Sequence, residues 1–370
     1  MKILSRYVLG EFLTPVAYCF VAFASLHLVF ELFGEFDKIL QAKPPVALVL
    51  RYIGGFLAKD LQWLVTPSLL LGGLYAMWQL ARHSEITAMR ASGIGFATIT
   101  APMLGAAAAA AVLTFACGEF YAPGAVYDSG VIKGSGFKHG SGQLMVDVHF
   151  NNVLDRRDWQ AATFDTGANR MTDVKITWTD ADGHREQVLT ADVATYQSDA
   201  WIFETANLVK YAYQPGAAAL VATERQVRSM VVMPELGEIP RDFVIEQNQQ
   251  GVNPTTESLS VRDMLRYVRM RPNLEGSDRR TWIYEIVNRF AAPLACIFIT
   301  LFAIPAGVAT GRQSVFAGVV MAIVLFIGYY ALSLFCGVQA KGGLIPVWLG
   351  VAFPTAAILA AGLYLFRRQR

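Results

Sequence analysis

Two blocks of apolar sequence, separated by a more polar stretch, constrain the fold of this 370-residue chain more than any other feature. The hydrocarbon core of a bilayer is about 30 Å thick, so a helix needs roughly 20 mostly apolar residues to cross it. Runs of that length occur before residue 123 and after residue 258, and none occurs between these positions. The sequence therefore predicts a membrane protein with one large water-exposed domain inserted between two groups of helices.

We predict six membrane-spanning helices, three on each side of the inserted domain. Proline or glycine interrupts several of them, which is tolerated where neighbouring helices satisfy the freed backbone groups. We expect the first run to be a retained helix, because it is much longer than the core of a secretory signal, which has roughly 7–15 residues. The predicted spans cover residues 9–33, 61–81, 96–120, 283–306, 315–338 and 347–366.

The composition agrees with this assignment. Charged residues make up 16% of the chain and the mean hydropathy is +0.38, whereas about 25% of residues are charged in an ordinary soluble protein. The formal net charge of +2 argues against broad binding of polyanions, and we expect no nucleic-acid partner. The four cysteines stand far apart in apolar runs and lack the spacing of metal or redox sites, so we expect no metal and no cofactor.

The inserted domain has the pattern of antiparallel β structure. Residues 174–179 alternate between apolar and polar side chains, and residues 180–183 then supply the turn of a hairpin. Short strands at this spacing are typical of a sandwich or a jelly roll. The predicted strands are residues 174–179, 188–196, 201–213 and 221–233.

Three regions follow from these patterns. Residues 1–122 contain the first three spans and a short cytoplasmic helix at 84–93, residues 123–258 form the β domain, and residues 259–370 contain a connector helix and the last three spans. Within the connector, Val261, Leu265 and Val268 share one face of an amphipathic helix.

The short loops carry an excess of cations on the side of the N-terminus, which favours cytoplasmic termini and a β domain on the opposite side. The cations on the inner side are Lys2, Arg6, Arg82, Arg90, Arg312, Arg367, Arg368 and Arg370. Those on the outer side are Lys38, Lys43, Arg51, Lys59 and Lys341.

The loop between the second and third spans is the first candidate site. Ser84 stands where it can cap a short helix, Glu85 favours the positive end of that helix, and Gly93 can end it. An apolar patch lies beside two arginines, comprising Ile86, Met89, Arg82 and Arg90. From the residues alone, this segment is either a helix that docks onto a motor subunit or an interfacial loop with inner-side charges.

Ionisable residues near the outer ends of the spans form a second group. Glu31 lies close to the end of the first span, and such a group tends to face a cavity or a partner, although it can also extend to the interface. Glu285 and Arg289, four residues apart, predict a structural ion pair. His27 has no acid or second ligand nearby in sequence, which favours a packed side chain over a proton relay.

No catalytic signature occurs in the sequence. The phosphate-binding loop of ATPases, the Gly-x-Ser-x-Gly motif and the His-Glu-x-x-His motif are all missing. We therefore expect no catalytic residues and no enzymatic activity, with energy supplied by a partner or by an ion gradient.

Several segments, taken in order, resemble a known family. Ser5, Arg6 and Tyr7 open the long first helix, and the loop at 82–93 follows. The others lie at residues 189–196, 201–203, 288–294, 303–307, 329–330 and 343–346. Together they resemble the permease subunits of the lipopolysaccharide-export ABC transporter, the LptF/LptG family, over nearly the whole chain.

The resemblance implies a multi-pass protein of the bacterial inner membrane, with a periplasmic β-jelly-roll domain between spans three and four. It implies that residues 84–93 are a coupling helix seated in a groove of a cytoplasmic ATPase, with Glu85 as the acidic contact. The residues of this contact are Arg82, Ser84, Glu85, Ile86, Met89 and Arg90.

The resemblance also implies that spans one and five form a lateral gate, through which lipid enters a central cavity. Aromatic residues of these spans are expected to line it, namely Phe20, Phe23, Phe30, Phe326, Tyr329 and Tyr330. Some family members carry a basic residue near the outer end of span one that attracts the lipid's phosphates. This chain departs from them, with Glu31 in that neighbourhood and Lys38 further along.

On this interpretation the chain extracts lipopolysaccharide from the inner membrane and passes it to a bridge of β domains. The partners that the resemblance implies are a cytoplasmic ABC ATPase dimer, a homologous six-span permease, a periplasmic β-jelly-roll bridge protein and a single-span regulatory subunit. One alternative is a stand-alone, ion-coupled secondary transporter of an envelope lipid that uses Glu31, His27 or Glu285. Another is a membrane-anchored β module, for which six spans are more than anchoring needs.

Overall fold

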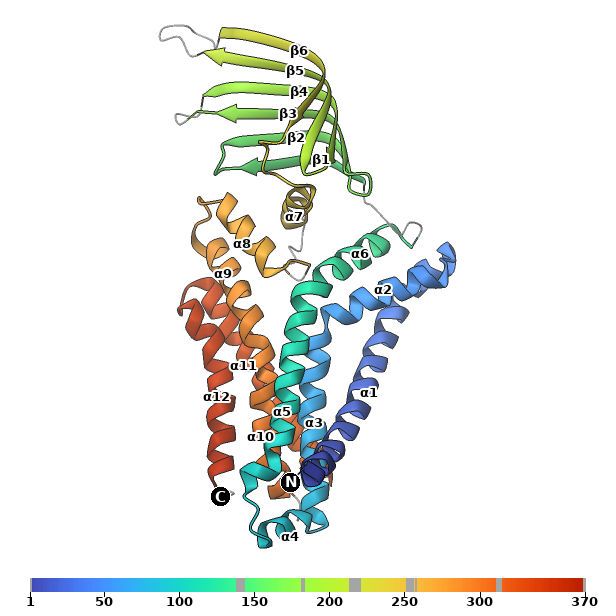
Figure 1. Cartoon of the computed structure of the whole chain (residues 1–370), viewed down its shortest axis with the longest axis vertical. Coiled ribbons are helices and arrows are strands. Elements are labelled where there is room, and N and C mark those ends of the chain that lie inside the picture. Colours follow the sequence, from blue (N-terminus) through green and yellow to red (C-terminus); the bar gives the residue numbers. More distant parts are fainter. Residues whose placement is uncertain are drawn as a thin grey trace.

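Helices form most of the chain, and a β domain is inserted between two helical halves (Figure 1). The computed structural model describes residues 2–137, 144–180, 184–212, 221–250, 256, 258–310 and 315–368. The first half contains α1 (Lys2–Ala42), α2 (Val46–Lys59), α3 (Leu61–Arg82), α4 (Glu85–Ala91), α5 (Phe96–Ala116), the π-helical turn η1 (Cys117–Tyr121) and α6 (Ala122–Gly134). The second contains α7 (Pro240–Gln250), α8 (Val261–Met270), α9 (Gly276–Ala291), the 3₁₀ turn η2 (Ala292–Leu294), α10 (Ala295–Thr310), α11 (Val315–Gly342) and α12 (Val347–Arg368).

The six predicted spans are confirmed. Among the described residues, six helical segments are long and apolar enough to cross a membrane, three before the β domain and three after it. The helices extend beyond the apolar runs from which they were predicted, because a helix continues through its polar ends once it leaves the hydrocarbon. Both termini and α4 lie at the end of the bundle opposite the β domain (Figure 1).

The third spanning helix shows this extension most clearly. It continues through η1 into α6, so residues 122–134, most of which we had assigned to the β domain, are helical. α6 lies along α2, where a Cβ atom on Gly55 would stand 2.1 Å from the carbonyl oxygen of Ala125. In η1, the carboxylate of Glu119 accepts a hydrogen bond from the backbone N–H of Val261 at 3.0 Å, which ties this span to the start of α8.

α3 and α10 form the centre of the helical bundle. The apolar clusters there are fully buried around Leu69, Met77 and Ile304. A Cβ atom on Gly307 of α10 would lie 2.7 Å from the carbonyl oxygen of Leu74 on α3, so glycine is what allows these two helices to approach. Small residues serve this purpose in membranes, where helix association depends on close packing.

The antiparallel β domain is confirmed, and its described strands form one curved sheet in which each strand pairs with the next along the chain. This meander is simpler than a Greek-key arrangement. The strands are β1 (Leu144–Asn152), β2 (Arg157–Asp165), β3 (Arg170–Thr179), β4 (Arg185–Gln197), β5 (Ala200–Ala212) and β6 (Val221–Met233). The predicted strands correspond to β3–β6, whereas β1 and β2 were not predicted. Most of the predicted 180–183 turn lies outside the described residues.

The concave face of the sheet is closed by α7, which lies directly beneath it (Figure 1). Phe243 of α7 is buried among aromatic side chains, with ring centroids 5.1 Å from Trp159 and 5.8 Å from Trp201. The indole N–H of Trp201 donates to the carbonyl oxygen of Glu238 at 2.7 Å and holds the start of this segment against the sheet. An amphipathic helix therefore completes the core that the sheet alone would leave open.

Ion pairs attach α7 to α8 and through it to the fourth span. Asp242 pairs with Arg266 at 2.9 Å, and Glu246 pairs with Arg271 at 2.6 Å. Burial raises the pKa of the Asp242 carboxyl above its ordinary value, so the arginine compensates for a desolvated charge. Tyr267 of α8 lies 4.5 Å, ring to ring, from Trp282 of α9.

The predicted connector helix is α8. One residue of the apolar face predicted for it, Leu265, does not lie on the buried side. Leu265 is 53% exposed, whereas Val261, Met264 and Tyr267 are buried. A capping box fixes where the helix begins, because Ser260 and Asp263 each accept a hydrogen bond from the other's backbone N–H. That start places Met264 and Tyr267, rather than Leu265, against α9.

We predict that Phe243→Ala destabilises the β domain. Removing a buried phenylalanine typically costs about 3–5 kcal/mol, through lost burial and the cavity left behind. Pulse proteolysis of the full-length protein in urea would detect the change as cleavage of the sheet at lower urea concentration. The control is Leu265→Ala at an exposed site, for which we expect little change. Equal resistance in both variants would contradict the role of α7 as part of this core.

Candidate functional site

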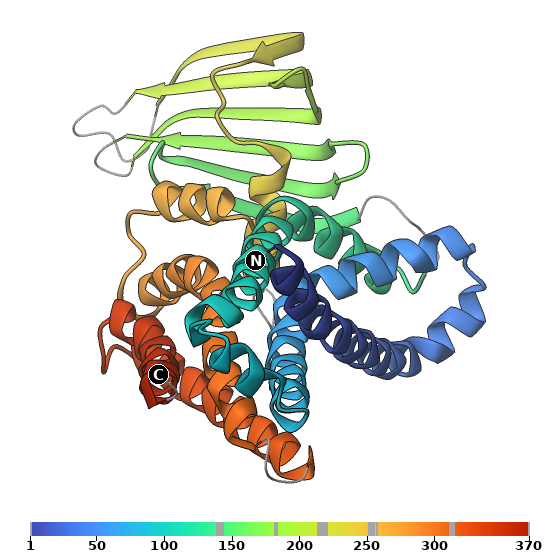
Figure 2. The same cartoon turned by 60° about the horizontal axis from the view of Figure 1, so that its bottom comes forward.

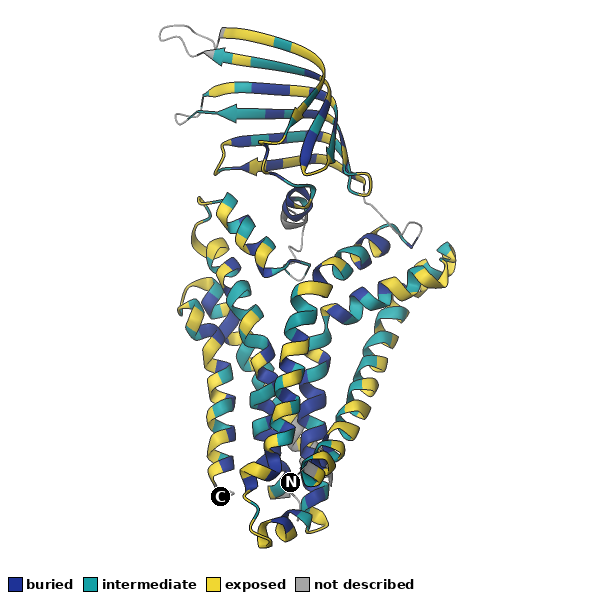
Figure 3. Cartoon of the chain, viewed as in Figure 1, coloured by how far each residue is buried: buried dark blue, intermediate teal, exposed yellow. Residues whose placement is uncertain are grey.

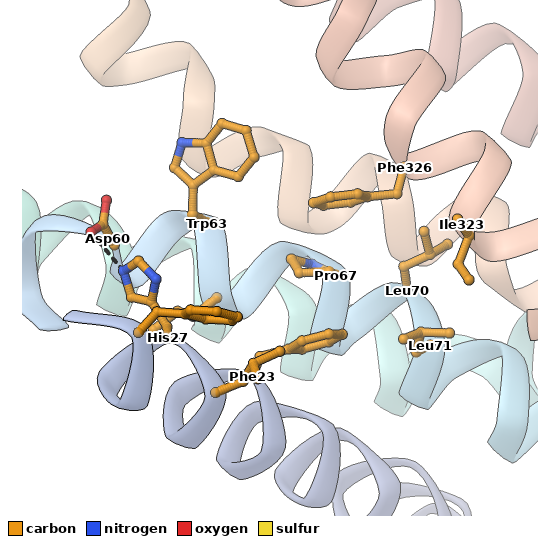
Figure 4. A pocket seen from close by; sticks show the side chains of 12 residues that line it. Phe23, His27, Asp60, Trp63, Pro67, Leu70, Leu71, Ile323 and Phe326 are labelled. Carbon is orange, nitrogen blue, oxygen red and sulfur yellow. Dashed lines mark hydrogen bonds and ion pairs between the residues drawn. The ribbon is translucent and has the colours of Figure 1, made fainter. Parts of the chain in front are cut away.

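An apolar cavity of about 500 Å³ lies between α1, α3 and α11 (Figure 4). α1 contributes Phe23 and Phe30, α11 contributes Phe326, and α3 forms the floor with Pro67 and Leu70. Three aromatic residues singled out in the sequence thus lie around one space, although Phe326 stands 296 residues after Phe30 in the chain (326 − 30). Phe20 is not part of this lining.

The cavity exists because α1 is held firmly near one end. Val8 and Phe12 are fully buried, while most of the following side chains are partly or fully exposed (Figure 3). Two views show α1 leaning away from the helices of the second half (Figures 1 and 2). α1 is therefore packed on the bundle at the end near α4, and its later turns stand apart from the helices of the second half.

His27 has an acidic partner, which corrects the interpretation that it stands alone. Its Nε2 lies 2.9 Å from Oδ2 of Asp60, and its ring stacks on Phe56 of α2 at 4.5 Å. Asp60 occupies the junction between α2 and α3 and lines the cavity together with His27 (Figure 4). Sequence spacing gave no sign of this pair, because the loop and a whole helix lie between the two residues.

A cluster of paired charges lies farther along α1, toward the β domain. Lys133 of α6 lies 2.9 Å from both Glu31 and Glu35, and Lys38 lies 2.7 Å from Glu35. The hydroxyl of Tyr52 on α2 donates to Glu31. Glu31 is therefore part of an ion-pair network between helices, and the cation beside it comes from a segment about 100 residues away.

Tyr329 and Tyr330 line a second cavity, next to the first and nearer the β domain. Glu285 and Arg289 also line it. Glu285 pairs with Lys341 of α11 at 2.6 Å, and Arg289 donates to the carbonyl oxygen of Leu259. The two residues predicted to pair along one helix thus connect α9 to two other segments.

The short helix predicted between spans two and three is α4, and Gly93 ends it. Gly93 has a φ of +85°, its N–H donates to Arg90, and the N–H of Ile94 donates to Met89, which together form a Schellman motif. Ser84 occupies the N-cap position, but in a left-handed conformation and without a side-chain capping bond. The expected N-cap position of Ser84 is therefore confirmed, but its side chain makes no capping hydrogen bond.

The side chains of α4 divide between an inner and an outer face. Ile86 and Met89, expected as an apolar patch, are buried in the same cluster as Val8 and Phe12. The hydroxyl of Tyr7 on α1 donates to the Glu85 carboxylate at 2.9 Å. Arg90 of α4 is exposed, as are Arg82 at the end of α3 and Ser84 at the N-cap of α4. The apolar pair thus anchors α4 to the bundle, and its polar side chains face outward.

The sequence matches a family described as the lipopolysaccharide export system permease LptF/LptG, over residues 6–368. The chain belongs to this family. Among curated proteins, none matches the sequence. Membership of LptF/LptG makes the chain a permease of lipopolysaccharide export, and its six apolar helices fit a multi-pass protein of the inner membrane.

The residues that sequence reasoning missed in this LptF/LptG permease are Asp60, Trp63 and Lys133. Trp63 stacks on Tyr330 at 3.9 Å, and both cavities include it in their walls. Each of the three interacts across a long separation in sequence, so no local pattern could reveal it. The one available signal is that an ionisable residue at a span end requires a partner.

We predict that Tyr7→Phe loosens α4 without altering the fold. The variant removes one hydrogen bond to a charged acceptor, which typically contributes about 1.5–3 kcal/mol. Hydrogen–deuterium exchange of the α4 amides should accelerate by roughly tenfold or more. Tyr18→Phe, at an exposed tyrosine of the same helix, is the control. Unchanged exchange in Tyr7→Phe would show that the buried apolar pair alone holds α4.

Proposed function

We propose that the chain is one permease subunit of an ABC transporter that extracts lipopolysaccharide from the inner membrane and passes it to a periplasmic bridge. The apolar cavity between α1, α3 and α11 carries this proposal, because it offers acyl chains a surface away from water. Removing acyl chains from a bilayer costs about 0.8 kcal/mol per exposed CH₂ group. A carrier of a multi-chain lipid therefore needs such a surface and an external source of energy.

The cavity is incomplete within this chain, which supports a second permease of similar fold as the partner. Large apolar side chains of α1 and α11 are exposed around it, including Phe30 at 70% and Val324 at 65%. A homologous six-span subunit that presents its own first and fifth spans would close the space. The single-span regulatory subunit is part of the same proposal and rests on the family resemblance alone.

The energy source we propose is a cytoplasmic ABC ATPase dimer docked on α4. The chain has no phosphate-binding loop of its own. α4 is fixed to the bundle by Ile86 and Met89, so a force on its outer face passes to α1 and α3 through buried contacts. The proposal puts α4 and both termini on the cytoplasmic side and the β domain in the periplasm, and the excess of cations at the α4 side supports this orientation.

The His27–Asp60 pair keeps an ion-coupled secondary transporter as the second candidate. A titratable pair at the wall of the cavity is what proton coupling would require. Against it, the other paired acids of α1, Glu31 and Glu35, lie nearer the β-domain end, and family membership favours the export system. Transport that continues without ATP but collapses with the proton gradient would favour this candidate.

Co-purification in mild detergent tests the ATPase partnership, with Glu85→Lys as the informative variant. We expect an ATP-binding subunit to co-purify with the wild type and to be reduced roughly tenfold or more in Glu85→Lys, because the variant reverses a charge at the proposed contact. Glu186→Lys, at an exposed position of β4, is the charge-matched control. Wild-type protein that purifies without any ATPase, under conditions where ABC complexes survive, would count against the proposal.

A separate prediction tests the cavity. Leu26→Gln places a polar amide on the cavity wall and should reduce the amount of lipopolysaccharide that co-purifies by about tenfold, since burying an unpaired amide costs about 1–3 kcal/mol. Leu113→Gln adds the same amide to an exposed face of α5, outside the cavity lining. We expect normal lipid content in this control. Equal loss in both variants would indicate a general effect on membrane insertion.

A further inference from the structure

The second cavity, which we call the polar cavity, has a chemistry unlike that of its neighbour. It measures about 430 Å³ and lies where the β-domain ends of α3, α5, α9 and α11 meet, with Met264 of α8 at its border. Five aromatic residues form part of its wall, namely Trp63, Phe115, Tyr284, Tyr329 and Tyr330. Small and apolar residues line it too, together with charged, amide and hydroxyl side chains that include Lys59, Asp60, Gln62, Glu285, Asn288, Arg289, Ser333 and Lys341.

One buried acceptor in this wall lacks a donor among the described residues. The side-chain nitrogen of Gln62 donates to the carbonyl oxygen of Ala292 at 2.9 Å and to Thr66 at 3.1 Å, which fixes the orientation of the amide. Its oxygen, Oε1, is buried and receives no hydrogen bond from the protein. Buried polar atoms in native proteins are nearly always satisfied, so this amide is a polar group of the lining residues that the described protein leaves incompletely bonded.

The two cavities meet at three aromatic rings in mutual contact, which we call the aromatic partition (Trp63, Phe326 and Tyr330). Trp63 stacks on Tyr330 at 3.9 Å, and Phe326 lies 4.6 Å from Tyr330, ring to ring. Asp60 and Trp63 line both spaces, and Phe326 lines the apolar one. An amphiphile with its chains in the apolar cavity would therefore have its head group at this partition, beside the polar cavity.

We propose that the polar cavity binds the sugar part of the glycolipid cargo. Aromatic faces stack on the C–H faces of a pyranose ring, and amides, hydroxyls and carboxylates bond its hydroxyl groups. This inference rests on the proposed function and adds to it the part of the lipid that the site recognises.

The charges at the site argue for a sugar rather than for a simple anion or cation. Lys341 and Glu285, which both line the cavity, pair with each other at 2.6 Å, and Asp60 lies within hydrogen-bond distance of the His27 ring at 2.9 Å, so three of the charged groups of the wall already have partners. A cationic head group would meet Lys59, Arg289 and Lys341. The mixture of rings, amides and hydroxyls is what distinguishes the site from a phosphate cradle, which relies on backbone N–H groups and clustered cations.

The test measures lipid binding by the full-length protein, reconstituted with its co-purifying subunits in nanodiscs. The two probes are lipid A, which has a glucosamine disaccharide, and phosphatidylglycerol, which has none. Asn288→Leu removes an amide from the wall with little change in volume, and Tyr330→Phe removes a hydroxyl while keeping the aromatic partition. Asn273→Leu, at an exposed position before α9, is the control.

We expect roughly fivefold to tenfold weaker binding of lipid A in each cavity variant, which corresponds to one lost hydrogen bond, and unchanged binding of phosphatidylglycerol. Chitobiose, a glucosamine disaccharide without acyl chains, should compete with lipid A in the wild type, and inorganic phosphate should not. Equal weakening of both lipids, no weakening of either, or competition by phosphate alone would each overturn the inference.

Failure here is distinguishable from failure of the proposed function. If the ATPase co-purifies and Leu26→Gln loses lipid, while Asn288→Leu and Tyr330→Phe bind lipid A normally, only the sugar site is wrong. If the wild type retains neither an ATPase nor lipopolysaccharide, the proposed function fails first, and the sugar site fails with it.

Discussion

The arrangement of the bundle depends on how α1 is attached. Val8 and Phe12 are buried with Ile86 and Met89 of α4, and Gly72 of α3 lets Val16 approach so closely that a Cβ atom there would stand 2.4 Å away. A 41-residue helix is about 60 Å long, so these contacts hold only its first turns. The remainder leans away, and the apolar cavity is the space that this leaves against α3 and α11. The apolar cavity therefore exists because the apolar contacts that hold α1 are confined to one end of that helix.

Polar pairs then determine how far the free part of α1 can move. His27 reaches Asp60 at the α2–α3 junction, and Lys133 of α6 reaches Glu31 and Glu35. Charged groups near hydrocarbon are costly without partners, so these pairs hold α1 close to α2 and α6 rather than close to α11. The side of the cavity between α1 and α11 has no such tie among the described residues. It is the side where separation of helices breaks the fewest polar contacts.

Local patterns predicted the helices and most strands, and long-range contacts account for what they missed. Apolar runs located the six spans, and alternation located β3–β6, because both signals are periodic within one element. β1 and β2 were missed, and Leu265 was assigned to the wrong face of α8. The site was predicted in part: Phe23, Phe30 and Phe326 lie together, but Asp60, Trp63 and Lys133 acquire their roles from partners on other helices. These partners come together only when the helices pack, so the sequence of one segment does not reveal them.

The β domain is supported by α6 of the first half and by α7 and α8, which link it to α9. Tyr127 of α6 donates to Thr166 at the sheet, while α7 and α8 link the sheet core to α9 through ion pairs and the Tyr267–Trp282 contact. Of these supports, α6 is also paired with α1 through Lys133, whereas the link through α7 and α8 reaches α9 without involving α1. The concave face of that sheet is already filled, since Phe243 lies within about 6 Å of four aromatic rings. An acyl chain that entered this face would have to displace Phe243 and would disturb the ion pairs between α7 and α8. Because α8 packs on α9, passage of lipid along the sheet would be coupled to the fourth span rather than to the first.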